Sequence, residues 1–167
     1  MQKTNKLGIE LIKKYEGFVP CVYLDCAEFL TIGYGHLCKE GDFYLRGKSL
    51  LMIKKMYLRD RREIEKMTEI SKSDAEELLK KDLIIAEQGV NKLIKVSLNL
   101  NQFSALVSFV FNLGVGALQR STLRQKLNRV EYFSVPSEMM RWVYAGGLKR
   151  KGLIKRRLEE ALLFNLL

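Results

Sequence analysis

The sequence predicts an α+β fold in which two lobes are joined by a long helix. Strand-like residues interrupted by glycine occupy 22–35, a long helical stripe follows Ser71, and every later pattern is helical. Strands and helices that are segregated along a chain are typical of α+β domains. We therefore expect a small N-terminal lobe over about 1–70, a connecting helix over about 71–95 and an all-helical C-terminal lobe over about 96–167.

The size and composition predict one globular domain. The chain has 167 residues, of which 47% are hydrophobic and 29% charged, enough for a core without disulfides or metals. Residues 1–14 carry five charges and no long apolar run, so they do not resemble a secretory signal, and no stretch has the length of a membrane span. We expect a monomer without a membrane span that stays in the cytosol after synthesis.

The net charge predicts a polyanionic partner. Lys and Arg outnumber Asp and Glu by 29 to 19, which gives a formal charge of +10. Nucleic acid, anionic lipid and an anionic cell wall would all attract such a chain. No P-loop, zinc-finger spacing or RNP-like strand is present, so no specific nucleic acid is expected. Seven basic residues without an acidic one form a predicted basic patch: Arg141, Lys149, Arg150, Lys151, Lys155, Arg156 and Arg157.

The N-terminal half contains three predicted elements. Apolar residues recur at helical spacing over 7–14, and Gly17 and Pro20 end that pattern. β-Branched and aromatic residues over 22–35 predict a small hairpin sheet. Apolar residues among basic ones over 44–67 predict one amphipathic helix, which either lies on the domain with a solvated basic face or disrupts membranes.

The C-terminal half has two capping signals. Ser71 with Asp74 begins the long connecting helix, and Asn99 with Gln102 begins the next, which Gly114 and Gly116 end. Three further helices are predicted at Ser121 to Asn128, Ser137 to Tyr144 and Ile154 to Leu166, with Gly146 and Gly147 between the last two.

The three cysteines predict free thiols. Cys21, Cys26 and Cys38 are an odd number in a chain without a recognisable signal. Together with His36 they could ligate zinc, although their spacing is not that of the common structural zinc sites. We expect no metal and no cofactor.

The most informative block lies between residues 15 and 36. It reads Y-E-G-F, then Y-L-D, then T-I-G-Y-G-H, with eight residues between Glu16 and Asp25 and five between Asp25 and Thr31. This pattern resembles the active-site signature of the T4-type phage lysozymes, a family of glycoside hydrolases that act as endolysins. The resemblance implies that Glu16, Asp25 and Thr31 are the catalytic residues.

The likeness continues through the second half of the chain. It includes N-Q-F-S-A-L-V-S-F-V-F-N-L-G at 101–114, S-T-L at 121–123, R-W-V-Y-A-G-G at 141–147 and G-L-x-x-R-R at 152–157. Residues 38 to about 68 depart from the family pattern and are longer than expected. The resemblance implies a lysozyme-like fold with an active-site cleft between the lobes. The departing segment could cover the cleft, change the preferred substrate length or pack outside it.

The chemistry of glycoside hydrolysis explains the three residue types. A glycosidic bond is broken by one carboxyl that protonates the departing oxygen and a second group that attacks or directs a water. Glu16, flanked by Tyr15 and Phe18, suits the general acid, because desolvation favours a protonated carboxyl. Asp25 on an open hairpin stays ionised as general base, and the Thr31 hydroxyl positions the water. Members of the family are described as inverting, so we expect the configuration of the anomeric carbon to be inverted and not retained through a covalent intermediate.

Five further positions receive roles from the resemblance. His36, the only histidine, is expected to pair with Asp82 rather than to act as a base. Leu37, Phe111 and Thr122 are expected to contact the glycan. Phe111 also lies in an apolar stripe typical of a core, and Trp142 and Tyr144 are more often packing residues than sugar platforms.

The resemblance therefore predicts a bacteriolytic enzyme. Its substrate would be bacterial peptidoglycan, cleaved at the β-1,4 bond between N-acetylmuramic acid and N-acetylglucosamine. It would wait in the host cytoplasm until a phage holin opened the inner membrane, and would act on the wall in the periplasm. The alternatives are an inactive cell-wall or nucleic-acid binding module, and a membrane-disrupting basic protein.

Overall fold

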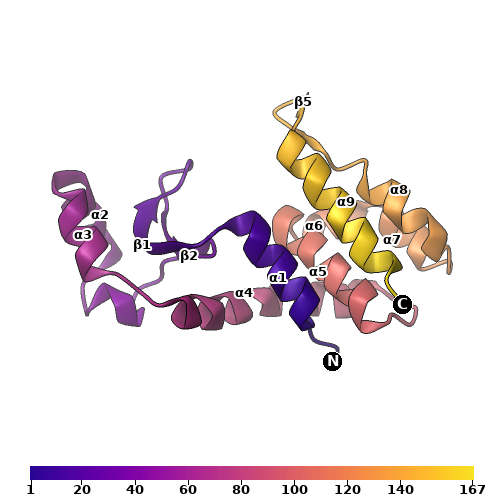
Figure 1. The fold of residues 1–167 in the computed structure, drawn as a ribbon, viewed down its shortest axis with the longest axis horizontal. Helices are drawn as coiled ribbons and strands as arrows, with labels where there is room; N and C mark the ends of the chain where they lie inside the picture. Colours follow the sequence, from indigo (N-terminus) through magenta and orange to yellow (C-terminus); the bar gives the residue numbers. More distant parts are fainter. The chain divides into compact units, whose positions relative to one another are not determined.

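The computed structural model describes residues 1–167 and divides them into two compact units. The helical unit comprises Met1–Tyr15 and Leu83–Leu167, and the sheet unit comprises Glu16–Asp82. Helix α4 (Lys72–Leu93) begins in the sheet unit and ends in the helical unit (Figure 1). The first fifteen residues therefore group with the C-terminal half of the chain.

The helical unit is built around helix α5. Its helices are α1 (Lys6–Glu16, up to Tyr15), the end of α4, α5 (Leu100–Leu113), α6 (Val115–Arg120), α7 (Thr122–Leu127), α8 (Val135–Met139) and α9 (Lys151–Asn165). The Asn99–Gln102 capping box is confirmed, and α5 ends at Gly114 as predicted. Helix α1 packs closely on α5, since a Cβ at Gly8 would lie 2.6 Å from that of Ser104. The core includes Phe103, Leu106, Phe109, Leu118, Leu123, Val135, Met139 and Phe164.

The prediction that the C-terminal half is all helical is wrong at one place. Residues 137–144 were expected to form a helix, but α8 ends at Met139, and strands β4 (Tyr144–Ala145) and β5 (Leu148–Lys149) pair as a hairpin. Gly146 and Gly147 form its turn with φ of 60° and 75°. Two consecutive positive φ angles are what a type I′ hairpin turn requires, and glycine adopts them without strain. The short helix α6 was not predicted.

The sheet unit carries a three-stranded antiparallel sheet of order β1-β2-β3. Its strands are β1 (Val19–Leu24), β2 (Leu30–Gly33) and β3 (His36–Leu37), as the hairpin prediction required. The buried side chains of this unit include Val22, Ile32, Leu45, Ile53, Ile64, Leu78 and Leu79. A 3-10 helix (Phe43–Leu45), helix α2 (Leu50–Arg59), helix α3 (Arg61–Met67) and the start of α4 complete the unit.

The segment that was expected to form one amphipathic helix forms two. Asp60 ends α2 and begins α3, and its Oδ1 accepts hydrogen bonds from the backbone N–H groups of Arg62 and Glu63 at 2.9 and 3.3 Å. A carboxylate that caps free backbone N–H groups competes with helix continuation, which explains the break. Helix α3 packs against β1 (Figure 1), and Val22 N donates to the buried Thr68 hydroxyl at 3.0 Å.

The beginning of α4 follows the sequence signal. Ser71 and Asp74 form the expected reciprocal cap, with Asp74 N donating to Ser71 Oγ and Ser71 N to Asp74 Oδ2, both at 3.1 Å. The helix is 22 residues long. Neither α4 nor any other helix combines the length and the apolar character that crossing a membrane demands.

Candidate active site

Glu16 lies where helix α1 gives way to the sheet. It is the last residue of α1, and the helix ends because Gly17 adopts a positive φ of 73°. Gly35 follows β2 with φ of 81°, and a Cβ on it would lie 3.6 Å from Glu16 Oε2. Glycine at position 35 therefore leaves its backbone close to the carboxyl group of Glu16.

Asp25 is held by the turn that follows β1. Its Oδ1 accepts hydrogen bonds from the backbone N–H groups of Ala27 and Phe29, both at 2.9 Å. The turn is closed by Asp25 N donating to Phe29 O and by Glu28 N donating to Asp25 O, each at 3.0 Å. Asp25 Oδ2 accepts no hydrogen bond from the protein. One oxygen thus fixes the side chain, and the other is available to a water or substrate.

Thr31 stands in a row of three residues across the sheet. It is the Cα partner of Tyr23 in β1 and of Leu37 in β3, so their side chains share one face. The Thr31 side chain is buried, and its hydroxyl donates to Phe29 O at 3.2 Å. That donation leaves the lone pairs of the hydroxyl oxygen to accept another hydrogen bond.

Tyr23 joins this group as the strand partner of Thr31, although it was not among the predicted site residues. Burial raises the pKa of its phenol, and the negative charges of Asp25 and Glu16 raise it further. Both predicted catalytic carboxylates therefore act on the same phenol within the sheet unit. The sequence held one signal that could have marked Tyr23 as a site residue. It lies two residues before Asp25, so both side chains are on the same side of an expected strand.

His36 pairs with Asp82, as the sequence analysis proposed. Its Nδ1 lies 2.7 Å from Asp82 Oδ2, and its Nε2 lies 3.5 Å from Asp42 Oδ2. Asp42 is itself held by Tyr44, whose hydroxyl donates to Oδ2 at 2.5 Å. Desolvation lowers the pKa of His36, but the hydrogen bond and charge of Asp82, together with the charge of Asp42, outweigh it, so the pKa is raised.

We expect the substitution Asp82→Asn to lower the free energy of unfolding by about 2 kcal/mol near pH 5.5, as for a hydrogen bond to a charged group. Because the folded-state pKa of His36 is raised, this contribution is complete below the unfolded value of about 6.5 and is lost as pH rises through the folded value. Urea unfolding at pH 5.5 and pH 9, with NMR titration of His36, measures both effects.

The matched control for this pair is Glu77→Gln on the same helix. Glu77 forms only an exposed ion pair with Lys80 at 2.7 Å, so its loss should change stability by less than about 0.5 kcal/mol. An unchanged His36 titration in the Asp82→Asn protein would show that the pair does not set the charge of the imidazole.

Comparison with known proteins identifies the family. Residues 13–160 match the family model described as phage lysozyme. The chain belongs to the phage lysozyme family. Among curated family members it is 31% identical to the endolysin of Salmonella phage P22, over 97% of this chain and 98% of that protein. It is 35% identical to the endolysin of Bacillus phage B103, over 96% of this chain.

The solved structures agree with the family assignment. A mutant of the P22 lysozyme superposes with a TM-score of 0.80 and 30% identity, covering 98% of this chain and 99% of that one. The muramidase domain of SpmX from Asticaccaulis excentricus superposes with a TM-score of 0.78 and 28% identity, covering 99% of both chains. The prediction of an α+β, lysozyme-like fold is confirmed. The chain spans about half the length of the Bacillus phage B103 and PZA endolysins that it matches.

The three residues expected to contact glycan are divided between the two units. Leu37 is exposed at the end of the sheet, beside Thr31. Phe111 and Thr122 belong to the helical unit. Phe111 is half-buried on α5, whereas Trp142 packs edge-to-face on Phe109 with ring centroids 5.7 Å apart. The packing interpretation of Trp142 is therefore confirmed, and the glycan contacts stay predictions.

Thr122 belongs to a cluster around the buried Glu138. Its hydroxyl donates to Glu138 Oε2 and accepts from Arg141 Nη1 at 2.9 Å, while Lys126 Nζ lies 2.6 Å from Glu138 Oε1. Burial raises the pKa of Glu138, but the hydrogen bonds from Lys126, Thr122 and Arg141 outweigh burial and lower it to about 2. The hydroxyl of Thr122 is thus already held by protein groups.

We expect Glu138→Gln to destabilise the protein by about 2 kcal/mol at pH 7. The lowered pKa of Glu138 would correspond to a stabilisation of the folded state by about 3 kcal/mol. Water screens the exposed side chains of Lys126 and Arg141, which reduces that stabilisation. Since the folded pKa is depressed, the contribution is present above the unfolded value of 4.5 and is lost as pH falls toward about 2. Denaturant midpoints at pH 7 and pH 3 measure this. Equal destabilisation at both values would contradict the electrostatic origin.

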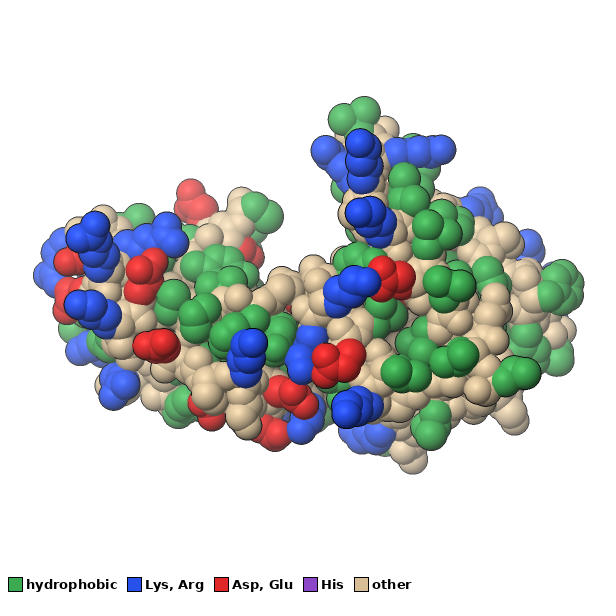
Figure 2. Space-filling view, in the orientation of Figure 1, with side chains coloured by type: hydrophobic (Ala, Val, Ile, Leu, Met, Phe, Trp, Pro, Cys, Tyr) green, Lys and Arg blue, Asp and Glu red, His purple; other side chains and the backbone are tan.

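The predicted basic patch is smaller than its sequence suggests. Figure 2 shows Lys and Arg side chains gathered near β5, and Arg141, Lys149, Arg150, Lys151 and Lys155 are exposed. The inclusion of Arg156 and Arg157 is wrong, because both are buried. Arg157 Nη1 lies 2.7 Å from Glu160 Oε2, and Arg156 Nε lies 3.2 Å from Glu160 Oε1. These three positions share the face of α9 that packs on α5.

The cysteines are free thiols with different surroundings. Cys26 is exposed, Cys21 is half-buried and Cys38 is buried. Burial raises the pKa of the Cys38 thiol to about 11, which keeps it protonated at neutral pH. No group of three or more ligating side chains is close enough to hold a metal ion, so the alternative set of three cysteines and His36 is not assembled.

Proposed function

We propose that this chain is an endolysin, a muramidase that hydrolyses the β-1,4 bond between N-acetylmuramic acid and N-acetylglucosamine in bacterial peptidoglycan. The observation that carries the proposal is that Asp25, held by the turn after β1, and the buried Thr31 of β2 lie in the same small unit as Gly35, where a Cβ would be 3.6 Å from the Glu16 carboxyl group. Family membership supports it, because relatives over most of this chain are named endolysins.

The geometry supports a division of labour between the two carboxyl groups. Glu16 protonates the departing glycosidic oxygen as that bond breaks. Asp25, held through Oδ1, uses Oδ2 to take a proton from water as the water attacks the anomeric carbon. Thr31 positions this water through its hydroxyl oxygen. The water supplies one proton and one hydroxyl group, and the proton gained by Asp25 returns to Glu16 through solvent.

The charge of the chain suits a wall that is a polyanion. The net charge is +10, and the exposed part of the basic patch lies on β5, at the start of α9 and, with Arg141, just before the β4–β5 hairpin. Exposed charges of this kind mainly increase the association rate and make it depend on salt. Wall binding should therefore weaken as ionic strength rises.

Digestion of purified walls tests the proposal. The released fragments are reduced with borohydride, and their ends are identified by mass spectrometry. Reduced muramic acid at the new ends supports muramidase activity, whereas reduced glucosamine or free peptide ends would contradict it. Leakage from liposomes without wall cleavage would instead favour the membrane-disrupting alternative.

The stereochemistry tests the role of Asp25 separately. An NMR spectrum of the first products shows whether the anomeric configuration is inverted or retained. Inversion is expected if Asp25 activates water, and retention would make Asp25 the nucleophile. Dependence on a holin, confinement to the host cytoplasm before lysis and the monomeric state stay predictions.

A further inference from the structure

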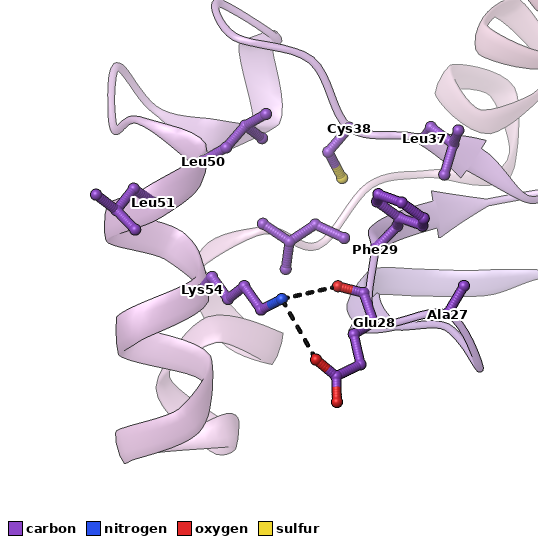
Figure 3. A pocket seen from close by; sticks show the side chains of 9 residues that line it. Ala27, Glu28, Phe29, Leu37, Cys38, Leu50, Leu51 and Lys54 are labelled. Carbon is purple, nitrogen blue, oxygen red and sulfur yellow. Dashed lines mark hydrogen bonds and ion pairs between the residues drawn. The ribbon is translucent and has the colours of Figure 1, made fainter.

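A cavity of about 510 Å³ lies beside the turn that holds Asp25. We call it the stem pocket, and the residues that line it include Ala27, Glu28, Phe29, Leu37, Leu51 and Lys54. Figure 3 shows it between the end of the sheet and the beginning of α2. One wall therefore comes from the catalytic hairpin, and the other comes from the segment that departs from the family pattern. The volume is in the range of sites for small ligands.

The walls of the stem pocket are apolar and exposed. Phe29, Leu37 and Leu51 leave 59%, 52% and 65% of their surfaces in contact with water, although they surround one cavity. Contiguous apolar surface of this kind is unfavourable in water and often marks a binding site. Covering these three side chains would provide a favourable contribution to ligand binding.

The stem pocket has one pair of charged groups. Lys54 Nζ donates to the backbone oxygen of Glu28 at 3.0 Å and lies 3.8 Å from its carboxylate (Figure 3). The Lys54 and Glu28 side chains are 38% and 82% exposed. An ion pair this exposed contributes little to stability, so its members can also bind charged groups of a ligand. Lys54 suits a carboxylate, and Glu28 suits an ammonium group.

The stem pocket is continuous with the residues that we propose to be catalytic. The N–H groups of Ala27 and Phe29 hold Asp25, and Leu37 is the strand partner of Thr31. A glycan that reacts at Asp25 would therefore bring its covalently attached substituents to the stem pocket. In peptidoglycan, these substituents are short peptides that combine alanine methyl groups with free carboxylates and, in many walls, an ammonium group.

We propose that the stem pocket binds the peptide stem of the peptidoglycan strand. This inference rests on the proposed function. Alanine methyl groups contact Phe29, Leu37 and Leu51, a stem carboxylate binds Lys54, and the ammonium group of a diamino acid binds Glu28. A sugar ring fits less well, because its many hydroxyl groups need polar partners and the walls of the stem pocket offer one charged pair.

Titration with a stem peptide alone tests binding without catalysis. The probe is the synthetic pentapeptide Ala-γ-Glu-Lys-Ala-Ala, with the stereochemistry of a natural stem, added to the isotopically labelled wild-type protein. Backbone NMR signals of Ala27, Phe29 and Leu51 should shift. Leu51→Gln should weaken binding about fivefold, as expected when an apolar side chain loses part of its burial.

The control is Leu58→Gln, which replaces an exposed leucine of the same helix outside the stem pocket. It should bind the peptide as the wild type does. Absence of shifts at the stem pocket, or equal weakening by both substitutions, would overturn the proposal. Because Leu51 is largely exposed, its replacement should leave the fold intact, and the NMR spectrum itself verifies this.

Cleavage rates provide a second test. Wild-type protein should cleave stem-bearing glycan several-fold faster than glycan stripped of its peptides by an amidase, and Leu51→Gln should reduce that ratio toward one. A ratio that Leu51→Gln leaves unchanged would contradict a role of the stem pocket in substrate preference. If wild-type protein cleaves neither glycan, the proposed function fails, while the peptide titration still decides whether the stem pocket binds peptide.

Discussion

Replacing Glu16 with Gln should reduce the rate of wall hydrolysis by about three orders of magnitude. The amide has nearly the same size as the carboxyl group but cannot supply a proton to the departing oxygen, and general acid catalysis contributes about 10²–10⁴-fold. The change keeps the end of α1 and the glycine at position 35 in place. Loss of turbidity of purified walls, followed with equal amounts of folded protein, measures the effect.

Glu10→Gln is the matched control for Glu16. Glu10 lies on the same helix and pairs at the surface with Lys13 at 2.9 Å, so its replacement should leave the rate within about twofold. If Glu16→Gln cleared walls as fast as this control, Glu16 would not be the acid. Wall cleavage would then have to be assigned to another carboxyl group or to a different activity.

Replacing Asp25 with Asn should reduce the rate by about 10²–10⁴-fold, the contribution of a general base. The amide oxygen can still accept the hydrogen bonds from Ala27 N and Phe29 N that now end on Oδ1. The turn should therefore persist, and only the negative charge facing the water is lost. Initial rates of reducing-end formation on soluble glycan, combined with a denaturation curve, separate catalysis from stability.

Glu69→Gln is a suitable control for Asp25, because Glu69 is an exposed carboxylate of the same unit. Its removal changes the net charge as Asp25→Asn does, but should leave the rate nearly unchanged. Equal losses in both variants would attribute the effect to general electrostatic attraction of the wall. A normal rate in Asp25→Asn would remove Asp25 from the mechanism.

Local signals in the sequence predicted much of the fold. The Asn99–Gln102 and Ser71–Asp74 caps depend on residues three positions apart, and both are present as expected. The hairpin sheet follows from strand-forming residues and glycine, with Glu16 at the end of the preceding helix, Asp25 in the turn after β1 and Thr31 in β2. These features could be predicted because their interactions join residues that are close in the chain.

Tertiary structure decided the features that depend on distant residues. Arg156 and Arg157 look like surface charges in sequence, but α9 packs on α5 with both of them buried, and both lie against Glu160. Tyr23 becomes notable only when the sheet forms and pairs it with Thr31. The stem pocket exists only because the departing segment places α2 against the hairpin. The sequence by itself determined most of the helices and strands and the candidate catalytic residues. Burial, ion pairing and the shape of the pocket were decided by tertiary packing, because they depend on which faces of the helices and the sheet meet.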